Sequence, residues 1–165
     1  MTTLRHLNNT MLFDSFILFE SFMVLAMTYS IRPHWKWNLV LAGCLGAMGM
    51  VWDFTSQTGE GLLGRGILII ACVMNVVLLA LLWSVARESD RALHQVPQFW
   101  LFMGILLFYG GLIPVLAMVG FVFQVDQHLA YSLWSIPPVL GAVRYLFATH
   151  ACVLERRLRQ KAPNE

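Results

Sequence analysis

Apolar and polar positions divide this chain into five long apolar runs separated by short polar breaks. Each run holds about 20 residues, the length of α-helix that crosses the ~30 Å hydrocarbon core of a bilayer. We therefore predict an all-α integral membrane bundle of five transmembrane helices, forming a single domain over residues 1–165. The predicted helices are residues 12–31, 37–54, 62–86, 99–123 and 129–149.

Composition supports lipid as the main solvent. Hydrophobic residues make up 58% of the chain and charged residues 12%, against about 45–50% and about 25% in soluble domains. The polar breaks are too short for a soluble domain, and nucleic acid is not an expected partner because the chain carries few charges. The expected partner of the apolar surface is the lipid bilayer.

The basic residues of the breaks predict the orientation. Lys and Arg concentrate on alternate breaks, which would lie on one side of the membrane, whereas the other side has only Arg5 and Arg65. Cytoplasmic loops carry this excess of cations, so we expect an inner-membrane protein with its N-terminus outside and a basic cytoplasmic tail at residues 155–165. The concentrated residues are Arg32, Lys36, Arg87, Arg91, Arg156, Arg157, Arg159 and Lys161.

Small residues and prolines interrupt the apolar runs. Glycines at close spacing, as at Gly43 and Gly104, let helix backbones approach each other in lipid. Pro114 and the Pro137–Pro138 pair each remove a backbone donor, so we expect kinks inside the fourth and fifth helices. Such kinks either are purely structural or frame a cavity.

Two aromatic runs resemble a known family. Residues 99–111, Phe-Trp-Leu-Phe-Met-Gly-Ile-Leu-Leu-Phe-Tyr-Gly-Gly, and residues 133–148 are similar to helices of a largely uncharacterised family of Bacteroidota. That family comprises multi-pass membrane proteins and histidine-kinase sensor modules. Its members usually have seven helices, and this chain resembles the last five. The resemblance implies a sensor-like or receptor-like class and no catalytic residue.

Few polar side chains fall inside the apolar runs, and three of these lie at similar depth. Glu20 is about 12 Å and Asn75 about 15 Å from the outer ends of their runs, and Tyr109 is comparably deep. An ionisable group in hydrocarbon is a functional candidate by default. We expect Glu20, Asn75 and Tyr109 to line one ligand-binding pocket, with Ser135 in a shallower position. The alternative is a carboxyl group that only holds helices together.

Arg144 is a basic residue inside the last predicted helix. It lies five residues from the cytoplasmic end of residues 129–149, where a long side chain can extend to the interface. The alternatives are a pairing with Glu20 and direct contact with a ligand. We include Arg144 among the candidate ligand-binding residues.

No enzyme constellation is present in the pattern, so we expect no catalytic residues, no cofactor and no metal site. A retinal Schiff base needs a lysine within a helix, and both lysines lie in polar segments. Haem needs two histidines at one depth, and only His34 and His150 offer such a pair. The three cysteines lack metal-binding spacing.

These observations favour a non-enzymatic sensor or receptor-like module that binds a small ligand within the bundle. A signal would then pass through the tail to a separate signalling or membrane-complex partner. The alternatives are a carrier of small molecules or lipids, and an accessory subunit of a larger membrane complex.

Overall fold

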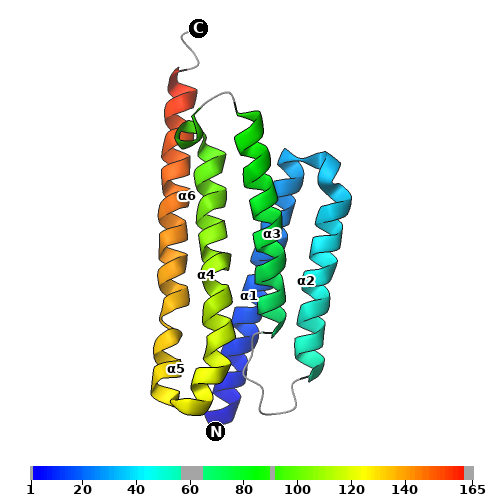
Figure 1. Cartoon of the computed structure of the whole chain (residues 1–165), viewed down its shortest axis with the longest axis vertical. Coiled ribbons are helices and arrows are strands. Elements are labelled where there is room, and N and C mark those ends of the chain that lie inside the picture. Colours follow the sequence, from blue (N-terminus) through cyan, green and yellow to red (C-terminus); the bar gives the residue numbers. More distant parts are fainter. Residues whose placement is uncertain (1, 57–64, 90–91, 162–165) are drawn as a thin grey trace. The chain divides into compact units, whose positions relative to one another are not determined.

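The computed structural model describes residues 2–56, 65–89 and 92–161, and every element in these ranges is helical (Figure 1). The prediction of an all-α protein is therefore confirmed for the described chain. The elements are the α-helices α1 (Thr2–Ile31), α2 (Lys36–Ser56), α3 (Arg65–Glu88), α4 (Pro97–Val125), α5 (Gln127–Leu133) and α6 (Ile136–Lys161), with the short 3₁₀ helices η1 (Pro33–Trp35) and η2 (Leu93–Gln95).

Three of the described helices are long and apolar enough to cross a membrane. These spans are Gly66–Glu88 in α3, Pro97–Val119 in α4 and Ile136–Gln160 in α6. A shorter apolar stretch, Ser15–Ile31, lies in α1. The expectation of a membrane protein is therefore supported by α3 and α4, which correspond to the third and fourth predicted helices, and by α6, the last described helix. The predicted start of the third helix, Leu62, lies outside the described residues.

The chain forms two compact units, Met1–Val77 and Leu78–Glu165, and α3 contributes its first half to one and its second half to the other. In the first unit, η1 connects α1 to α2. Arg32 precedes Pro33 and is not helical, with φ −132° and ψ 71°, because the proline ring disfavours the helical conformation of the residue before it. The chain therefore leaves α1 at Ile31 and enters α2 at Lys36.

Glycines set how closely α2 approaches its neighbours in the first unit. A Cβ atom at Gly43 would lie 3.4 Å from the Phe22 ring of α1, and one at Gly49 would lie 3.2 Å from Cβ of Ile69 in α3. These contacts confirm that the glycine-rich face of the second predicted helix is a packing face. Because lipid offers no hydrophobic drive for helix association, such close packing is what holds the helices together.

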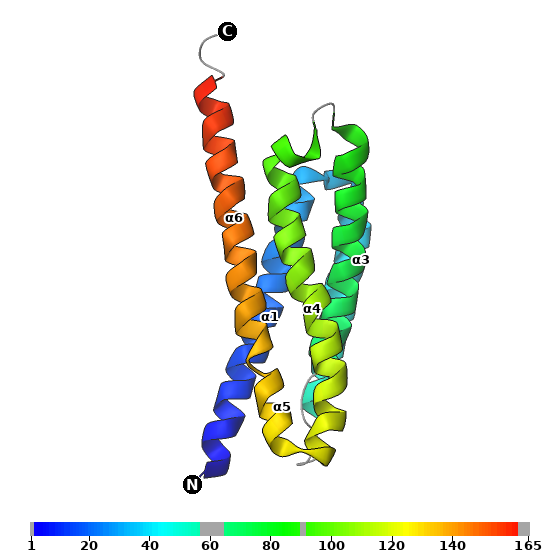
Figure 2. The same cartoon turned by 60° about the vertical axis from the view of Figure 1, so that its left-hand side comes forward.

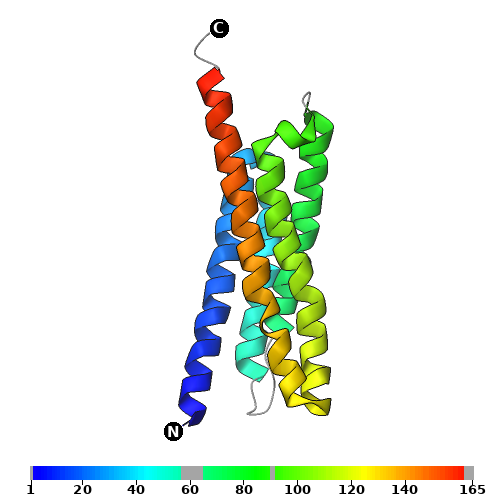
Figure 3. The same ribbon diagram turned by 90° about the vertical axis from the view of Figure 1, so that its left-hand side faces the viewer.

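The second unit is built on the pair α4 and α6, which run alongside each other in Figures 2 and 3. Phe102, Phe108, Tyr109 and Leu112 of α4 are buried. Pro114 lies inside α4, and the helix continues through it to Val125. The predicted helix is therefore not interrupted at Pro114.

The fifth predicted segment, residues 129–149, is two helices instead of one. It breaks at Trp134–Ser135, between α5 and α6. Pro137 and Pro138 occupy the first turn of α6, where the missing N–H groups have no intrahelical partner to lose. The proline pair therefore starts a helix, whereas the sequence interpretation placed a kink inside one. The other end of α6 continues to Lys161, so residues 155–161 of the basic tail are helical.

Candidate functional site

Arg144 lies between aromatic rings on the face of α6 that packs against α4. Its guanidinium carbon is 5.0 Å from the centroid of the Phe108 ring of α4 and 4.9 Å from that of Tyr145 on its own helix. A cation over an aromatic face is attracted by the ring quadrupole, by up to about 2 kcal/mol where water is excluded. We call Arg144, Phe108 and Tyr145 the arginine clamp.

The full length of α6 gives the place of Arg144 within the helix. Because α6 begins at Ile136 and ends at Lys161, Arg144 is in the first half of the helix, about 25 Å from its C-terminal end at 1.5 Å per residue. The Arg144 guanidinium lies over the Phe108 and Tyr145 rings and does not extend to that end of the helix. The extension of Arg144 to the cytoplasmic interface stays a prediction, since the end of α6 at Lys161 includes the basic tail that was expected beyond the membrane.

Gly104 allows the close approach of α4 and α6 beside the arginine clamp. A Cβ atom built there would lie 2.6 Å from Cβ of Phe147 and 3.2 Å from the backbone oxygen of Arg144. Real Cβ atoms do not approach so closely, and neither contacted atom belongs to a flexible side-chain tip. Only glycine therefore fits this part of the interface without moving one helix.

A second aromatic group continues this interface toward the start of α4. The Trp100 ring lies 5.7 Å from that of Phe147 and 4.9 Å from that of His150, the latter edge to face. Its Nε1–H donates to the backbone oxygen of His94 in η2 at 2.9 Å. Trp100 therefore ties together α4, α6 and η2.

The five predicted site residues divide between the two units. Glu20 and Asn75 belong to the first unit, and Tyr109, Ser135 and Arg144 to the second. Tyr109 is fully buried and its ring lies 5.4 Å from that of Phe108, so Tyr109 and Arg144 have a common neighbour. Each unit is described by itself, so the shared pocket of Glu20, Asn75 and Tyr109 stays a prediction.

Several polar side chains of the apolar helices bond to their own backbone. The Asn75 amide donates to the Ala71 oxygen at 2.8 Å, and the buried hydroxyls of Ser21 and Thr28 donate to Ile17 and Val24 at 2.7 and 2.8 Å. This i to i−4 bond shields a polar group from lipid without a second helix. Asn75 therefore has a structural hydrogen bond already in place.

Ser135 and Glu20 have different surroundings. Ser135 is exposed at the break before α6, and its hydroxyl donates to the Ser132 oxygen at 2.7 Å. Glu20 is half-buried, and its Oε2 atom is buried. Of the two, only Glu20 has a polar atom enclosed by the protein.

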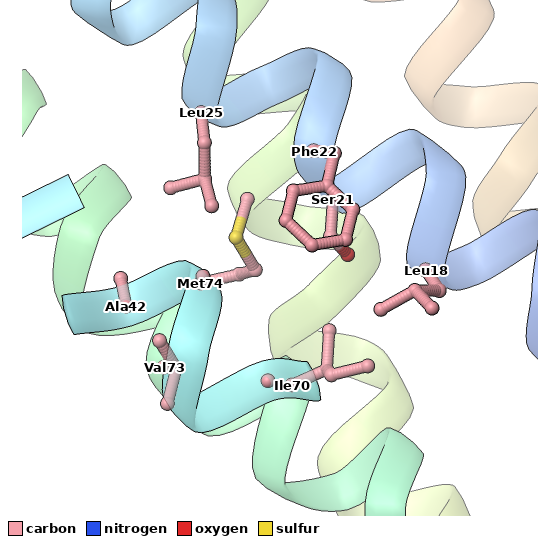
Figure 4. A pocket seen from close by; sticks show the side chains of 10 residues that line it. Leu18, Ser21, Phe22, Leu25, Ala42, Ile70, Val73 and Met74 are labelled. Atoms are coloured by element: carbon pink, nitrogen blue, oxygen red, sulfur yellow. The ribbon is translucent and has the colours of Figure 1, made fainter. Parts of the chain in front are cut away.

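A crevice lies among α1, α2 and α3 in the first unit, near the middle of α1. Figure 4 shows Phe22 and Leu25 of α1 and Met74 of α3 converging on it. The space open to a water-sized sphere is about 10 Å³, which is room for about one water. The crevice is therefore part of the packing and is too small for a ligand.

The aromatic partners of Arg144 were missed in the sequence. Tyr145 adjoins Arg144 in the chain, and such a neighbour was a usable signal. Phe108 is one of several phenylalanines of α4, and only the α4–α6 packing selects it. Among the residues that the structure describes, no group of three or more His, Cys, Asp or Glu side chains is placed to hold a metal ion.

Comparison with known proteins adds no family. No protein-family model, curated protein or solved structure matches the chain. The resemblance to the Bacteroidota sensor-module family therefore stays an expectation, and the candidate site stands on its own geometry.

Proposed function

We propose that this chain is a non-enzymatic inner-membrane protein that acts as a sensor or receptor-like module. In this proposal α1, α2, α3, α4 and α6 all cross the membrane, the N-terminus is outside and the C-terminal tail is cytoplasmic. Support comes from the three long apolar helices, from α1 and α2 of 30 and 21 residues, and from the bias of loop cations.

The arginine clamp is the observation that carries the proposed ligand site. A guanidinium in an apolar helix is expensive in lipid and marks functional positions. The two rings attract its faces, while hydrogen bonds to a guanidinium form in its plane. A ligand carboxylate or phosphate would therefore bind along the edge of the guanidinium.

The continuity of α6 supports a signalling role for such binding. One helix, Ile136–Lys161, contains both Arg144 and the basic segment at its end. A ligand that prefers one arrangement of Arg144 and the Phe108 ring would favour one packing of α6 on α4. The basic end of α6 would move with the helix and alter its contacts with a separate partner.

The other predicted site residues have different roles in this proposal. Asn75 and Ser135 already donate to backbone oxygens of their own neighbourhoods, so they are the weaker ligand contacts. Tyr109 would act through the Phe108 ring that it packs against. Glu20 remains a candidate contact from the first unit.

Native mass spectrometry of protein gently solubilised from its own membrane tests the site. We expect a retained small-molecule adduct on the wild type and on Arg159→Gln, which removes a cation from the exposed end of the same helix. Arg144→Gln should lose at least ninety per cent of the adduct because the charge is gone, whereas Arg144→Lys should keep part of it. An adduct of equal occupancy on Arg144→Gln would refute the proposed site.

The same spectra separate the alternatives. A co-purified protein subunit in place of a small molecule would favour an accessory role in a larger complex. Transport of a solute by the reconstituted protein would favour a carrier, although the crevice of the first unit, with room for about one water, offers no pathway for one.

A further inference from the structure

An open groove lies where the end of α6 passes η2 in the second unit. Its volume is about 420 Å³ and it is lined by Gln95, Leu154, Arg157, Leu158 and Gln160. This size is within the range of small-molecule sites. The groove shares no residue with the arginine clamp.

The register of α4 and α6 explains why the groove is open. Gly104 and Trp100 of α4 meet Phe147 of α6, and Trp100 also meets His150. Since the helices are antiparallel, the first residue of α4, Pro97, comes level with α6 one turn after His150. The last turns of α6 therefore extend beyond α4, as Figures 2 and 3 show.

The 3₁₀ helix η2 forms the other wall of the groove. The Trp100 Nε1–H donates to the backbone oxygen of His94 in η2 at 2.9 Å, and the Gln95 N–H donates to the Ala92 oxygen at 2.8 Å. Both bonds hold the backbone that leads into Gln95. Gln95 therefore lines the groove from a fixed backbone, together with the residues of α6.

The lining from α6 combines apolar and cationic side chains. Leu154 and Leu158 are half-buried, while Arg156 and Arg157 are exposed. Arg159 is engaged by Glu155, with 2.8 Å between Nε and Oε1. Arg157 is thus the groove's cation, with the amides of Gln95 and Gln160 beside it. Such a site offers a cation and amide donors next to apolar side chains.

We propose that this groove binds the phosphate of an anionic phospholipid. The phosphate would accept hydrogen bonds from Arg157 and from the Gln95 and Gln160 amides, and the start of the acyl chains would lie on Leu154 and Leu158. The location fits, because the apolar span of α6 ends in this segment and basic residues just beyond a transmembrane helix attract anionic headgroups. The proposal needs α6 to span the membrane and does not depend on a sensor function.

Lipid binding to the purified full chain in a zwitterionic detergent tests the proposal. Phosphatidylglycerol or phosphatidylcholine is titrated in at physiological salt, and bound lipid is counted by native mass spectrometry. Wild type should bind phosphatidylglycerol more tightly than phosphatidylcholine. Arg157→Gln should weaken phosphatidylglycerol binding about fivefold, the effect of one cation near an anionic surface.

Arg159→Gln is the matched control, because it removes the same charge two residues away from a side chain that Glu155 already engages. It should change lipid binding less than twofold. Both variants alter exposed side chains, and unchanged melting temperatures would verify that they fold. Equal losses for the two variants would show general attraction and overturn the site.

Two further probes distinguish the occupant. Glycerol phosphate, which lacks acyl chains, should fail to displace phosphatidylglycerol at millimolar concentration, and equal binding would overturn the lipid assignment. Polyglutamate should not compete either. Displacement of the lipid by polyglutamate would instead indicate that the groove accepts an acidic protein segment.

Discussion

At the scale of single residues, the chain shows how a charged or polar group is accommodated in apolar helices. Arg144 is received by Phe108 and Tyr145, whereas Asn75, Ser21 and Thr28 bond to the backbone one turn earlier. A backbone oxygen one turn earlier satisfies a polar donor within the same helix. A single backbone oxygen does not compensate the charge of a guanidinium, whereas the two aromatic rings do. Arg144 is therefore the residue whose surroundings depend most on another helix.

Asp126 gives a prediction at this scale, because it caps α5. Its Oδ1 accepts from the backbone N–H groups of His128 at 2.8 Å and Leu129 at 3.3 Å, which lack partners at a helix start. Asp126→Ala should lower the free energy of unfolding by about 1 kcal/mol, and Asp126→Asn by only a few tenths. Reversible unfolding in mixed micelles, followed by tryptophan fluorescence, measures both. Equal losses would indicate that the charge matters instead of the cap.

At the scale of elements, glycine decides how closely α4 and α6 pack. Three glycines of this pair differ in what surrounds them. A Cβ atom at Gly104 would meet Cβ of Phe147 at 2.6 Å, one at Gly111 would meet the flexible end of Leu140 at 2.6 Å, and one at Gly141 would meet only Phe108 at 4.0 Å. The first contact requires a helix to move, and the second requires only a rotamer change.

Alanine substitution should therefore order the three sites. Gly104→Ala should destabilise the protein by about 1–3 kcal/mol, as overpacking of a close interface does, and Gly111→Ala by less. Gly141→Ala is the control and should stay within about 0.5 kcal/mol of the wild type. The same unfolding assay measures all three. A Gly141 variant as unstable as the Gly104 variant would contradict this account of the interface.

At the scale of the whole molecule, the orientation in the membrane follows from loop charge. Alkaline phosphatase fused after Gly59 or Asp126 should be active and after Ser89 or Lys161 inactive, because the enzyme folds only outside the cytoplasm. Matched fusions of a cytoplasmic reporter should show the reverse activities. Activity after Ser89 and none after Gly59 would invert the proposed topology and exclude the cytoplasmic tail.

The features that the sequence determined by itself depend only on residues close together in the chain. Apolar run lengths predicted that long helices cross the membrane, and three helices of the described chain are long and apolar enough to do so. Glu20 and Arg144 were found because a charge in an apolar run is visible without a fold. The signal for the start of α6 was also local, since a proline pair marks a helix N-terminus. Pro137 and Pro138 were instead interpreted as a kink inside a helix.

Tertiary structure decided what depends on which helix faces which. Gly104 and Gly141 look alike in the sequence, and only the α4–α6 packing gives a Cβ atom at Gly104 a backbone neighbour at 3.2 Å and one at Gly141 only the Phe108 ring at 4.0 Å. Phe108 became the partner of Arg144 for the same reason. A residue's type sets what it can bind, whereas the antiparallel register of two helices sets which side chain it meets, and no local pattern encodes that register.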